Sequence, residues 1–196
     1  MEAIRDYLRK LLEQAFEPLV PVLLWCRVTP NQVSLVGILL NLVGAALIVD
    51  DRLLPAGLVY LLAGSLDLLD GALARSAKMS SRFGAFLDST ADRISEGVVF
   101  AAIAYHFAHH GLPVDAALTV LALLGSLLVS YTRARAEGLG LECKVGIVTR
   151  AERVVLVALG LMLGLLPAAI YLLVVLTALS ATQRIVHTLR QLHPHG

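Results

Sequence analysis

The sequence has few charged residues. Of its 196 residues, 16% are charged and 58% are hydrophobic, and the mean hydropathy is +0.79. A soluble domain has about 25% charged and about 45–50% apolar residues. This composition excludes an ordinary soluble protein and predicts an integral membrane protein, whose length suits one domain of several helices.

The sequence also has little cysteine. Cys26 and Cys143 show no CxxC spacing and have no neighbouring histidine, so we expect neither a disulfide framework nor a zinc site built on them. The N-terminal stretch has acids among its bases and no small-residue cleavage site, so we expect no cleaved signal peptide. The net charge of +1 identifies no partner by itself, and we expect none that is a nucleic acid.

Six apolar segments divide the chain. They cover approximately residues 33–49, 55–75, 86–107, 113–135, 151–165 and 167–190. The fifth is short for a hydrocarbon core of about 30 Å, so its helix must begin in the polar zone near Arg150. The sequence therefore predicts an all-α integral membrane protein with six transmembrane helices.

A different pattern precedes these segments. Residues 2–17 place apolar and charged side chains on opposite helix faces, which is typical of an amphipathic helix in the membrane interface, and Trp25 suits a headgroup-level anchor. We predict a single domain over residues 1–196, with the interfacial helix and anchor in residues 1–25 and the six-helix bundle in residues 31–190.

The positive charges are unevenly distributed. Of the 16 Lys and Arg residues, all but Arg52 belong to the N-terminal arm, the second-to-third link, the fourth-to-fifth link or the C-terminal tail, together with the segment ends beside them. The positive-inside rule then predicts that both termini are cytoplasmic. On this topology His106, His109 and His110 face outside, where we expect headgroup-level polar residues rather than ligands.

Residues 67–92 hold four aspartates in this apolar context. Asp67 and Asp70 share one helix face, as do Asp88 and Asp92 on the next predicted helix. Each would cost about 2.5–3.5 kcal/mol at a bilayer centre, so something must compensate them. Carboxylates without cysteine or histidine suit hard cations, and four of them predict two Mg²⁺ ions, or Mn²⁺, at the cytoplasmic rim.

Two other interpretations of these aspartates stay open. They are interhelical ion pairs with nearby basic residues, or stations of a small cation transporter. A transport pathway needs acids across the whole bilayer. No acid lies inside the first or sixth apolar run, and the fourth has only Asp115 at its start, which disfavours it.

The same stretch resembles the signature of the CDP-alcohol phosphatidyltransferase family, D-x2-D-G-x2-A-R-x8-G-x3-D-x3-D, with every spacing kept. The resemblance implies a homodimeric membrane enzyme that transfers a phosphatidyl group from a CDP-linked lipid to an alcohol and releases CMP. It implies that all four aspartates are near or bind the metals and that Asp92 is the general base. The residues implied for CDP-lipid binding are Asn31, Gln32, Val33, Ser34, Gly71, Ala74, Arg75, Ser81 and Gly84.

A second stretch, residues 130–153, concentrates arginines on the cytoplasmic side, and Arg184 lies near the end of the sixth segment. Membrane topology alone explains the number of basic residues on the cytoplasmic side. Arginine also binds phosphate in bidentate fashion, so we predict a phosphorylated polyol acceptor. The pattern resembles bacterial phosphatidylinositol-phosphate synthases and archaeal archaetidylinositol-phosphate synthases, which implies the plasma membrane of a prokaryote. The residues implied to hold inositol phosphate are Ser130, Arg133, Arg153 and Arg184.

The acceptor has an alternative. Phosphatidylglycerophosphate synthases use glycerol 3-phosphate, which also carries a phosphate, and bacterial inositol-phosphate enzymes often have Lys where this chain has Arg133. The sequence does not distinguish CDP-diacylglycerol from an ether analogue. Gly160 and Gly164 form GxxxG in the fifth segment, which favours close helix packing within the bundle or between subunits.

Overall fold

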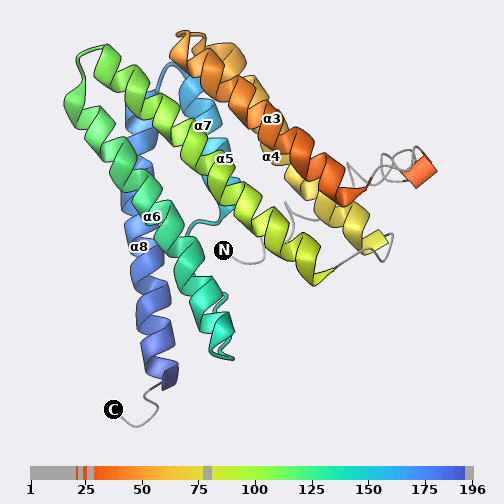
Figure 1. The fold of residues 1–196 in the computed structure, drawn as a ribbon. Helices are drawn as coiled ribbons and strands as arrows, with labels where there is room; N and C mark the ends of the chain where they lie inside the picture. The colour runs from red at the N-terminus through yellow and green to blue at the C-terminus, as the bar shows by residue number, and fades with distance from the viewer. Residues whose placement is uncertain (1–20, 22–23, 26–28, 77–80, 193–196) are drawn as a thin grey trace.

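The computed structural model shows an all-helical bundle (Figure 1). It describes residues 21, 24–25, 29–76 and 81–192, and no strand occurs among them. The helices are α3 (Pro30–Val49), α4 (Leu53–Ser76), α5 (Arg82–His109), α6 (Pro113–Gly138), α7 (Arg150–Leu163) and α8 (Leu166–Leu192). Each predicted segment corresponds to one helix, whereas the predicted interfacial helix, residues 2–17, lies outside the described residues.

The six helices close into a ring. Each packs mainly against two others, in the order α3, α4, α7, α8, α6, α5 and back to α3. This order differs from the order along the chain, because α7 packs on α4 and α5 packs on α3. The ring therefore brings α3, α4, α5 and α7 around one interior region.

Local sequence sets where the helices begin. Thr29 precedes α3, Pro30 occupies its first turn, and the Gln32 side chain accepts a hydrogen bond from the Thr29 N–H at 2.9 Å. Ser81 precedes α5, and its hydroxyl accepts from the Gly84 N–H at 2.9 Å. In α7 the Glu152 carboxylate accepts from the Thr149 N–H at 2.7 Å, which fixes the helix start at Arg150.

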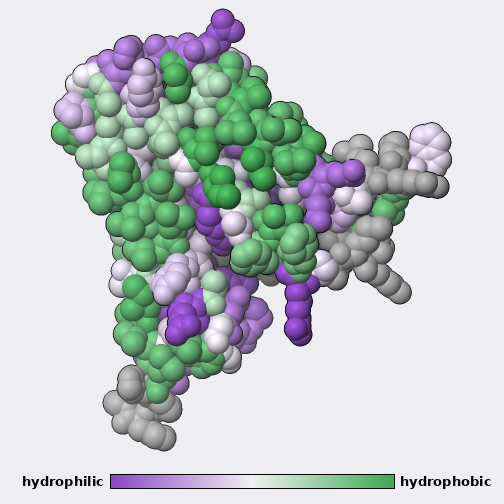
Figure 2. All heavy atoms as spheres, in the orientation of Figure 1, coloured by the Kyte–Doolittle hydropathy of each residue, from purple (hydrophilic) through white to green (hydrophobic). Residues whose placement is uncertain are grey.

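The core and the outer surface are both apolar. Fully buried residues such as Ile103, Phe100 and Leu173 fill the interior, while leucines and valines of every helix are exposed outside. Figure 2 shows hydrophobic residues over most of the visible face and hydrophilic residues mainly near the ends of the helices. Such an exposed apolar surface is far larger than a soluble monomer tolerates, so it indicates a membrane protein.

Three described helices are long and apolar enough to cross a bilayer by length and composition. They are α3, α6 and α8, and the apolar part of α4, Leu53–Asp67, is shorter. The charged residues of α5 and the 14-residue length of α7 keep these helices outside that criterion. The count of six spans stays a prediction.

The GxxxG motif has two different roles in the structure. A Cβ on Gly160 would approach the Cβ of Ala169 in α8 to 2.6 Å, so this glycine permits α7–α8 packing within the bundle. Gly164 follows the last residue of α7 and adopts a left-handed φ of 69°. It therefore ends the helix instead of extending a packing face.

Candidate active site

Three of the four signature aspartates meet inside the bundle. Asp67 comes from α4, and Asp88 and Asp92 lie one helical turn apart on α5. One oxygen from each of the three carboxylates lies within 4.8 Å of the others. A third helix, α3, packs against both α4 and α5, the two helices that carry these aspartates.

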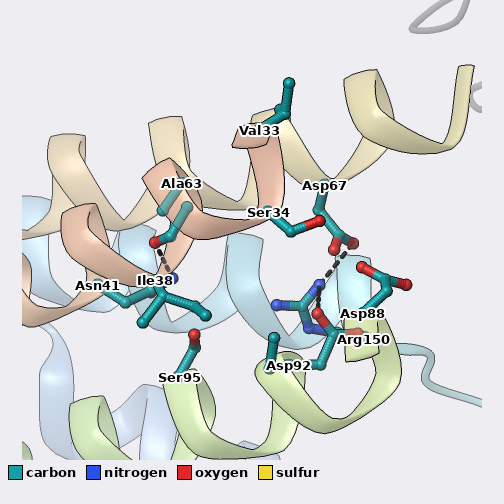
Figure 3. A pocket seen from close by; sticks show the side chains of 12 residues that line it. Val33, Ser34, Ile38, Asn41, Ala63, Asp67, Asp88, Asp92, Ser95 and Arg150 are labelled. Atoms are coloured by element: carbon teal, nitrogen blue, oxygen red, sulfur yellow. Dashed lines mark hydrogen bonds and ion pairs between the residues drawn. The ribbon is translucent and has the colours of Figure 1, made fainter. Parts of the chain in front are cut away.

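These aspartates line a pocket (Figure 3). Its walls are supplied by α3, α4, α5 and α7. Ser34, Gly37 and Asn41 form the α3 side, and Ser95 continues the α5 side one turn beyond Ala91. Asn41 is only 5% exposed, and its side-chain oxygen has no hydrogen-bond partner, so it offers an acceptor to a ligand donor in this pocket.

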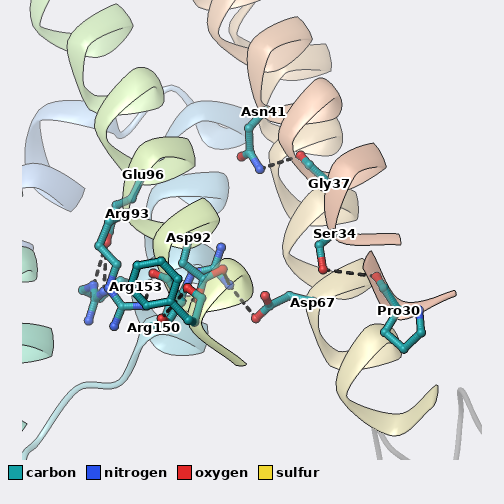
Figure 4. Close-up of polar contacts among 12 residues, drawn as sticks. Pro30, Ser34, Gly37, Asn41, Asp67, Asp92, Arg93, Glu96, Arg150 and Arg153 are labelled. Atoms are coloured by element: carbon teal, nitrogen blue, oxygen red, sulfur yellow. Dashed lines mark hydrogen bonds and ion pairs between the residues drawn. The ribbon is translucent and has the colours of Figure 1, made fainter. Parts of the chain in front are cut away.

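Arg150 reaches into the middle of the cluster from the first turn of α7. Its Nη1 lies 2.5 Å from Asp67 Oδ2 and 2.9 Å from Asp92 Oδ1 (Figures 3 and 4). The positive charge of one guanidinium therefore balances only part of the negative charge of the three carboxylates. The remaining negative charge favours a cation in the same pocket.

The donor set fits a hard divalent cation. Two oxygens that bind one Mg²⁺ at about 2.1 Å are at most about 4.2 Å apart. The observed spread of up to 4.8 Å is close to that limit, so small rotations of the Asp67, Asp88 and Asp92 side chains suffice. The absence of nitrogen or sulfur ligands among these three residues disfavours zinc.

The rest of the α4 signature follows Asp67 along the same helix. Asp70, Gly71, Ala74 and Arg75 lie within α4, but the description of the structure does not extend to their side chains. Their predicted roles therefore stay predictions.

Other residues predicted for the CDP-lipid gather at one place. A Cβ on Gly84 would lie 3.1 Å from Ser81 Oγ and 3.6 Å from Asn31 Oδ1, so these three residues are adjacent. Val33 and Ser34 line the pocket itself, and the Ser34 hydroxyl donates to Pro30 O at 3.2 Å (Figure 4).

Gln32, the remaining α3 residue of that set, has a structural contact. Its side-chain oxygen accepts from the Thr29 N–H at the start of α3. This bond helps to position the helix end that carries Asn31 and Ser34.

Arg153, predicted for the acceptor phosphate, is buried in an internal ion pair. It is 2% exposed, and its Nε and Nη2 donate to the two Glu96 carboxylate oxygens at 2.9 and 3.1 Å (Figure 4). The pair links α7 to α5 next to the aspartates. Arg153 therefore has a structural partner that its position in the sequence did not indicate.

The other predicted acceptor residues lie on α6 and α8. Arg184 is buried, and it donates from Nε to Val145 O at 2.8 Å and from Nη1 to Val129 O at 2.5 Å. Val129 immediately precedes the half-buried Ser130, so Arg184 and Ser130 are near each other. Arg133 is half exposed and pairs with Glu137 one turn along α6 at 2.8 Å.

Arg150 is the residue whose contact with the aspartates was not predicted. The sequence feature that could have indicated this contact is the R-A-E-R segment, in which Arg150 lies three residues before Arg153. Spacing places both on one face of α7. It does not say that one would contact the aspartates and the other Glu96.

Comparison with known proteins identifies the family. The sequence model described as CDP-alcohol phosphatidyltransferase matches residues 27–184. The chain is 34% identical to an archaetidylinositol phosphate synthase of Pyrococcus horikoshii, over 94% of this chain and 96% of that protein. The chain therefore belongs to the CDP-alcohol phosphatidyltransferase family, as its signature predicted.

Solved structures of one bacterial relative share this fold. The phosphatidylinositol phosphate synthase of Mycobacterium tuberculosis with CDP-DAG bound is 33% identical, with a TM-score of 0.80, over 88% of this chain and 92% of that one. The same enzyme in complex with manganese and citrate has a TM-score of 0.79 at 33% identity, with 87% of each chain covered. A neighbour solved with manganese, together with the acidic cluster of this chain, supports a divalent metal cofactor.

Proposed function

We propose that this chain transfers a phosphatidyl-type group from a CDP-linked lipid to the hydroxyl of inositol phosphate and releases CMP. The observation that carries the proposal is the convergence of Asp67, Asp88 and Asp92 on one pocket, within a complete family signature. Relatives named for inositol phosphate products, matched over nearly the full chain, support this acceptor.

Asp67, Asp70, Asp88 and Asp92 hold two divalent cations in this proposal, Mg²⁺ or Mn²⁺. When bound, the ions neutralise the pyrophosphate and the negative charge that develops on the departing CMP. Asp92 also takes the proton from the acceptor hydroxyl. Its closeness to the metal charge keeps its carboxylate ionised until substrate arrives.

The nucleotide end of the CDP-lipid lies along the N-terminal turns of α3 and α5. Asn31, Ser81 and Gly84 offer polar atoms and open space beside each other, which supports this placement. Gln32, Val33 and Ser34 complete the α3 side. Gly71, Ala74 and Arg75 complete the α4 side, where small residues leave room for the ligand.

The acceptor phosphate lies on the side of α6, α7 and α8. Ser130, Arg133, Arg153 and Arg184 are the residues proposed to hold it. Arg153 and Arg184 keep their internal partners as well, so they are pre-positioned for a phosphate and lose little side-chain entropy when it binds. Arg150 adds a further guanidinium within reach of the reacting phosphates.

We further propose the membrane arrangement predicted from the sequence. Six helices span a prokaryotic plasma membrane, both termini and the aspartates face the cytoplasm, and residues 1–25 form an interfacial helix and anchor. The single domain over residues 1–196 acts as a homodimer. The exposed apolar surface and the distribution of Lys and Arg support this arrangement.

One assay tests the reaction. The purified chain receives CDP-diacylglycerol or its ether analogue, Mg²⁺ and either inositol phosphate, glycerol 3-phosphate, free inositol or serine, and CMP release is measured. We expect release with inositol phosphate and little with the others. Release with glycerol 3-phosphate alone would transfer the proposal to the phosphatidylglycerophosphate reaction. No CMP with any acceptor would leave a cation transporter as the alternative.

Asp92→Asn tests the proposed role of Asp92 within that assay. The loss of a general base costs about 10²–10⁴-fold in rate, so CMP release should fall by at least this factor. Asp115→Asn is the matched control, because Asp115 lies elsewhere and accepts from Tyr171 Oη at 2.7 Å. Comparable activity in the two variants would remove Asp92 from the base role.

A further inference from the structure

A second cluster of metal-ligating side chains lies at the other end of α5. His106 Nδ1 is 2.8 Å from Asp51 Oδ1, and His110 Nε2 is 3.4 Å from Asp51 Oδ2. One ligand atom from each of the three side chains lies within 4.8 Å of the others. His106 is 14 residues beyond Asp92, so this cluster is about 20 Å along α5 from the aspartates.

The two histidines have the spacing and the chemistry of a metal-binding pair. They are four residues apart near the end of one helix, so both rings face the same side, with centroids 4.4 Å apart. His110 Nδ1 is 2.7 Å from His106 O, which can only accept, so Nδ1 carries the proton. Its Nε2 then faces Asp51 Oδ2 at 3.4 Å, the arrangement of metal-binding histidines whose other nitrogen bonds a carbonyl.

Asp51 has a left-handed backbone conformation, which glycine adopts most readily. It has φ 59° just after α3, where its N–H donates to Ile48 O at 3.1 Å and the Arg52 N–H donates to Leu47 O at 2.8 Å. This is the left-handed position of a Schellman motif, which usually holds glycine. Aspartate adopts this conformation more readily than most residues other than glycine, and here it directs a carboxylate toward the two histidines.

The end of α5 supplies an internal comparison. There the Leu112 N–H donates to Phe107 O at 2.9 Å, and the left-handed residue is Gly111 with φ 70°. Two adjacent helix ends thus use the same motif, one with glycine and one with Asp51. Of these two left-handed residues, only Asp51, which faces the two histidines, carries a side chain.

We propose that Asp51, His106 and His110 form a binding site for a borderline transition-metal ion, with Zn²⁺ as its natural occupant. Two imidazole nitrogens and one carboxylate oxygen are a three-ligand Zn²⁺ set whose fourth position takes water. Nitrogen ligands select against the Mg²⁺ that suits the aspartate site. The bound ion links the α3–α4 turn to the end of α5, on the side of the molecule opposite the proposed active site.

The test is Zn²⁺ binding by calorimetry to the full chain without a polyhistidine tag, in excess Mg²⁺ to saturate the aspartate site. We expect one Zn²⁺ per chain, and Co²⁺ in its place should give a visible d–d absorption typical of histidine coordination. Loss of an outer partner of a metal ligand costs about 10–100-fold in affinity. Loss of the ligands His106 or His110 by substitution with Ala should therefore weaken binding by more than that.

Three further variants make the outcome decisive. Asp51→Asn keeps a residue that tolerates positive φ but removes the charge, so it should weaken Zn²⁺ binding without unfolding the chain. His109→Ala is the matched control, because His109 stacks on Tyr105 instead of facing Asp51, and it should bind Zn²⁺ normally. His193→Ala/His195→Ala should also bind normally. Equal binding by all variants, loss only in His193→Ala/His195→Ala, or no binding by the unsubstituted chain would overturn the proposal.

Discussion

Arg150 and a divalent cation need the same carboxylate oxygens. In this structure the guanidinium contacts Asp67 and Asp92 and leaves two of the three negative charges unbalanced. A metal ion that binds there must displace at least one of these contacts. The released guanidinium would remain in the pocket, where it is suited to bind substrate phosphate.

Arg150→Gln should therefore lower the Mg²⁺ concentration that gives half-maximal CMP release, and it should also lower kcat. A partly exposed ion pair contributes up to about 1 kcal/mol, which corresponds to about a fivefold change in the half-saturating concentration. Arg93→Gln is the control, since Arg93 lies 3.8 Å from Asp92 and should give a smaller change. An unchanged or higher Mg²⁺ requirement in Arg150→Gln would contradict this competition.

The Glu96–Arg153 pair allows stability and acceptor binding to be separated. Removal of one partner leaves a buried charge unpaired, which costs about 3–5 kcal/mol. Arg153→Met should thus lower the melting temperature strongly, and Glu96→Met/Arg153→Met should recover most of it. If Arg153 also binds the acceptor phosphate, the double variant keeps a raised acceptor KM with an unchanged CDP-lipid KM. A normal acceptor KM in the double variant would limit Arg153 to its structural contact.

At the scale of the helices, the start of α7 determines the positions of both arginines. Thr149 and Glu152 cap the helix, which places Arg150 in the first turn beside the aspartates and Arg153 one turn further, beside Glu96. The R-A-E-R segment thus contains two interhelical contacts and one cap. A shift of the helix start would turn both guanidinium groups away from their partners.

Helices α4 and α7 pack closely at Gly57. A Cβ on Gly57 would lie 2.8 Å from Ala158 O and 2.6 Å from Met162 Cγ, and the carbonyl cannot rotate away. Gly57→Ala should therefore destabilise the bundle by about 1–3 kcal/mol, measured as a lower melting temperature in detergent. Gly97→Ala is the control, because nothing lies within 4 Å of its Cβ and alanine favours a helix. An equal melting temperature for both variants would show that α4 and α7 separate easily.

At the scale of the molecule, the ring of helices creates the pocket. The aspartates of α4 and α5 and Arg150 of α7 belong to three separate segments, and α3 packs against α4 and α5 and contributes its own side of the pocket. No pair of consecutive helices contains the whole site. The candidate active site therefore depends on the packing of α3, α4, α5 and α7.

Metal removal tests this dependence. EDTA should abolish CMP release, and Mg²⁺ or Mn²⁺ should restore it. Binding at 100 times Kd stabilises the folded chain by about 2.7 kcal/mol, so the melting temperature should rise with added Mg²⁺. Asp67→Asn/Asp88→Asn should lose this rise. If the double variant keeps the full thermal shift, the metal binds elsewhere.

Much of the fold was predictable because it depends on local patterns. Apolar length, Pro30, Pro113 and the glycine-containing links placed all six helices within a few residues of their observed bounds. The contacts of His106 and His110 with Asp51 were not predicted from the sequence. Their contacts with Asp51 depend on a turn more than 50 residues earlier, which no local pattern indicates.

The sequence alone determined the family, and the spacing of the signature indicated which aspartates share a helix face. It also determined the apolar composition of the helices. Only the tertiary structure decided which side chains of different helices meet. Arg150 contacts the aspartates, Arg153 contacts Glu96, and Asp51 contacts two histidines. The reason is that contacts between helices depend on the order and rotation of the helices in the ring, and those are properties of the packed bundle.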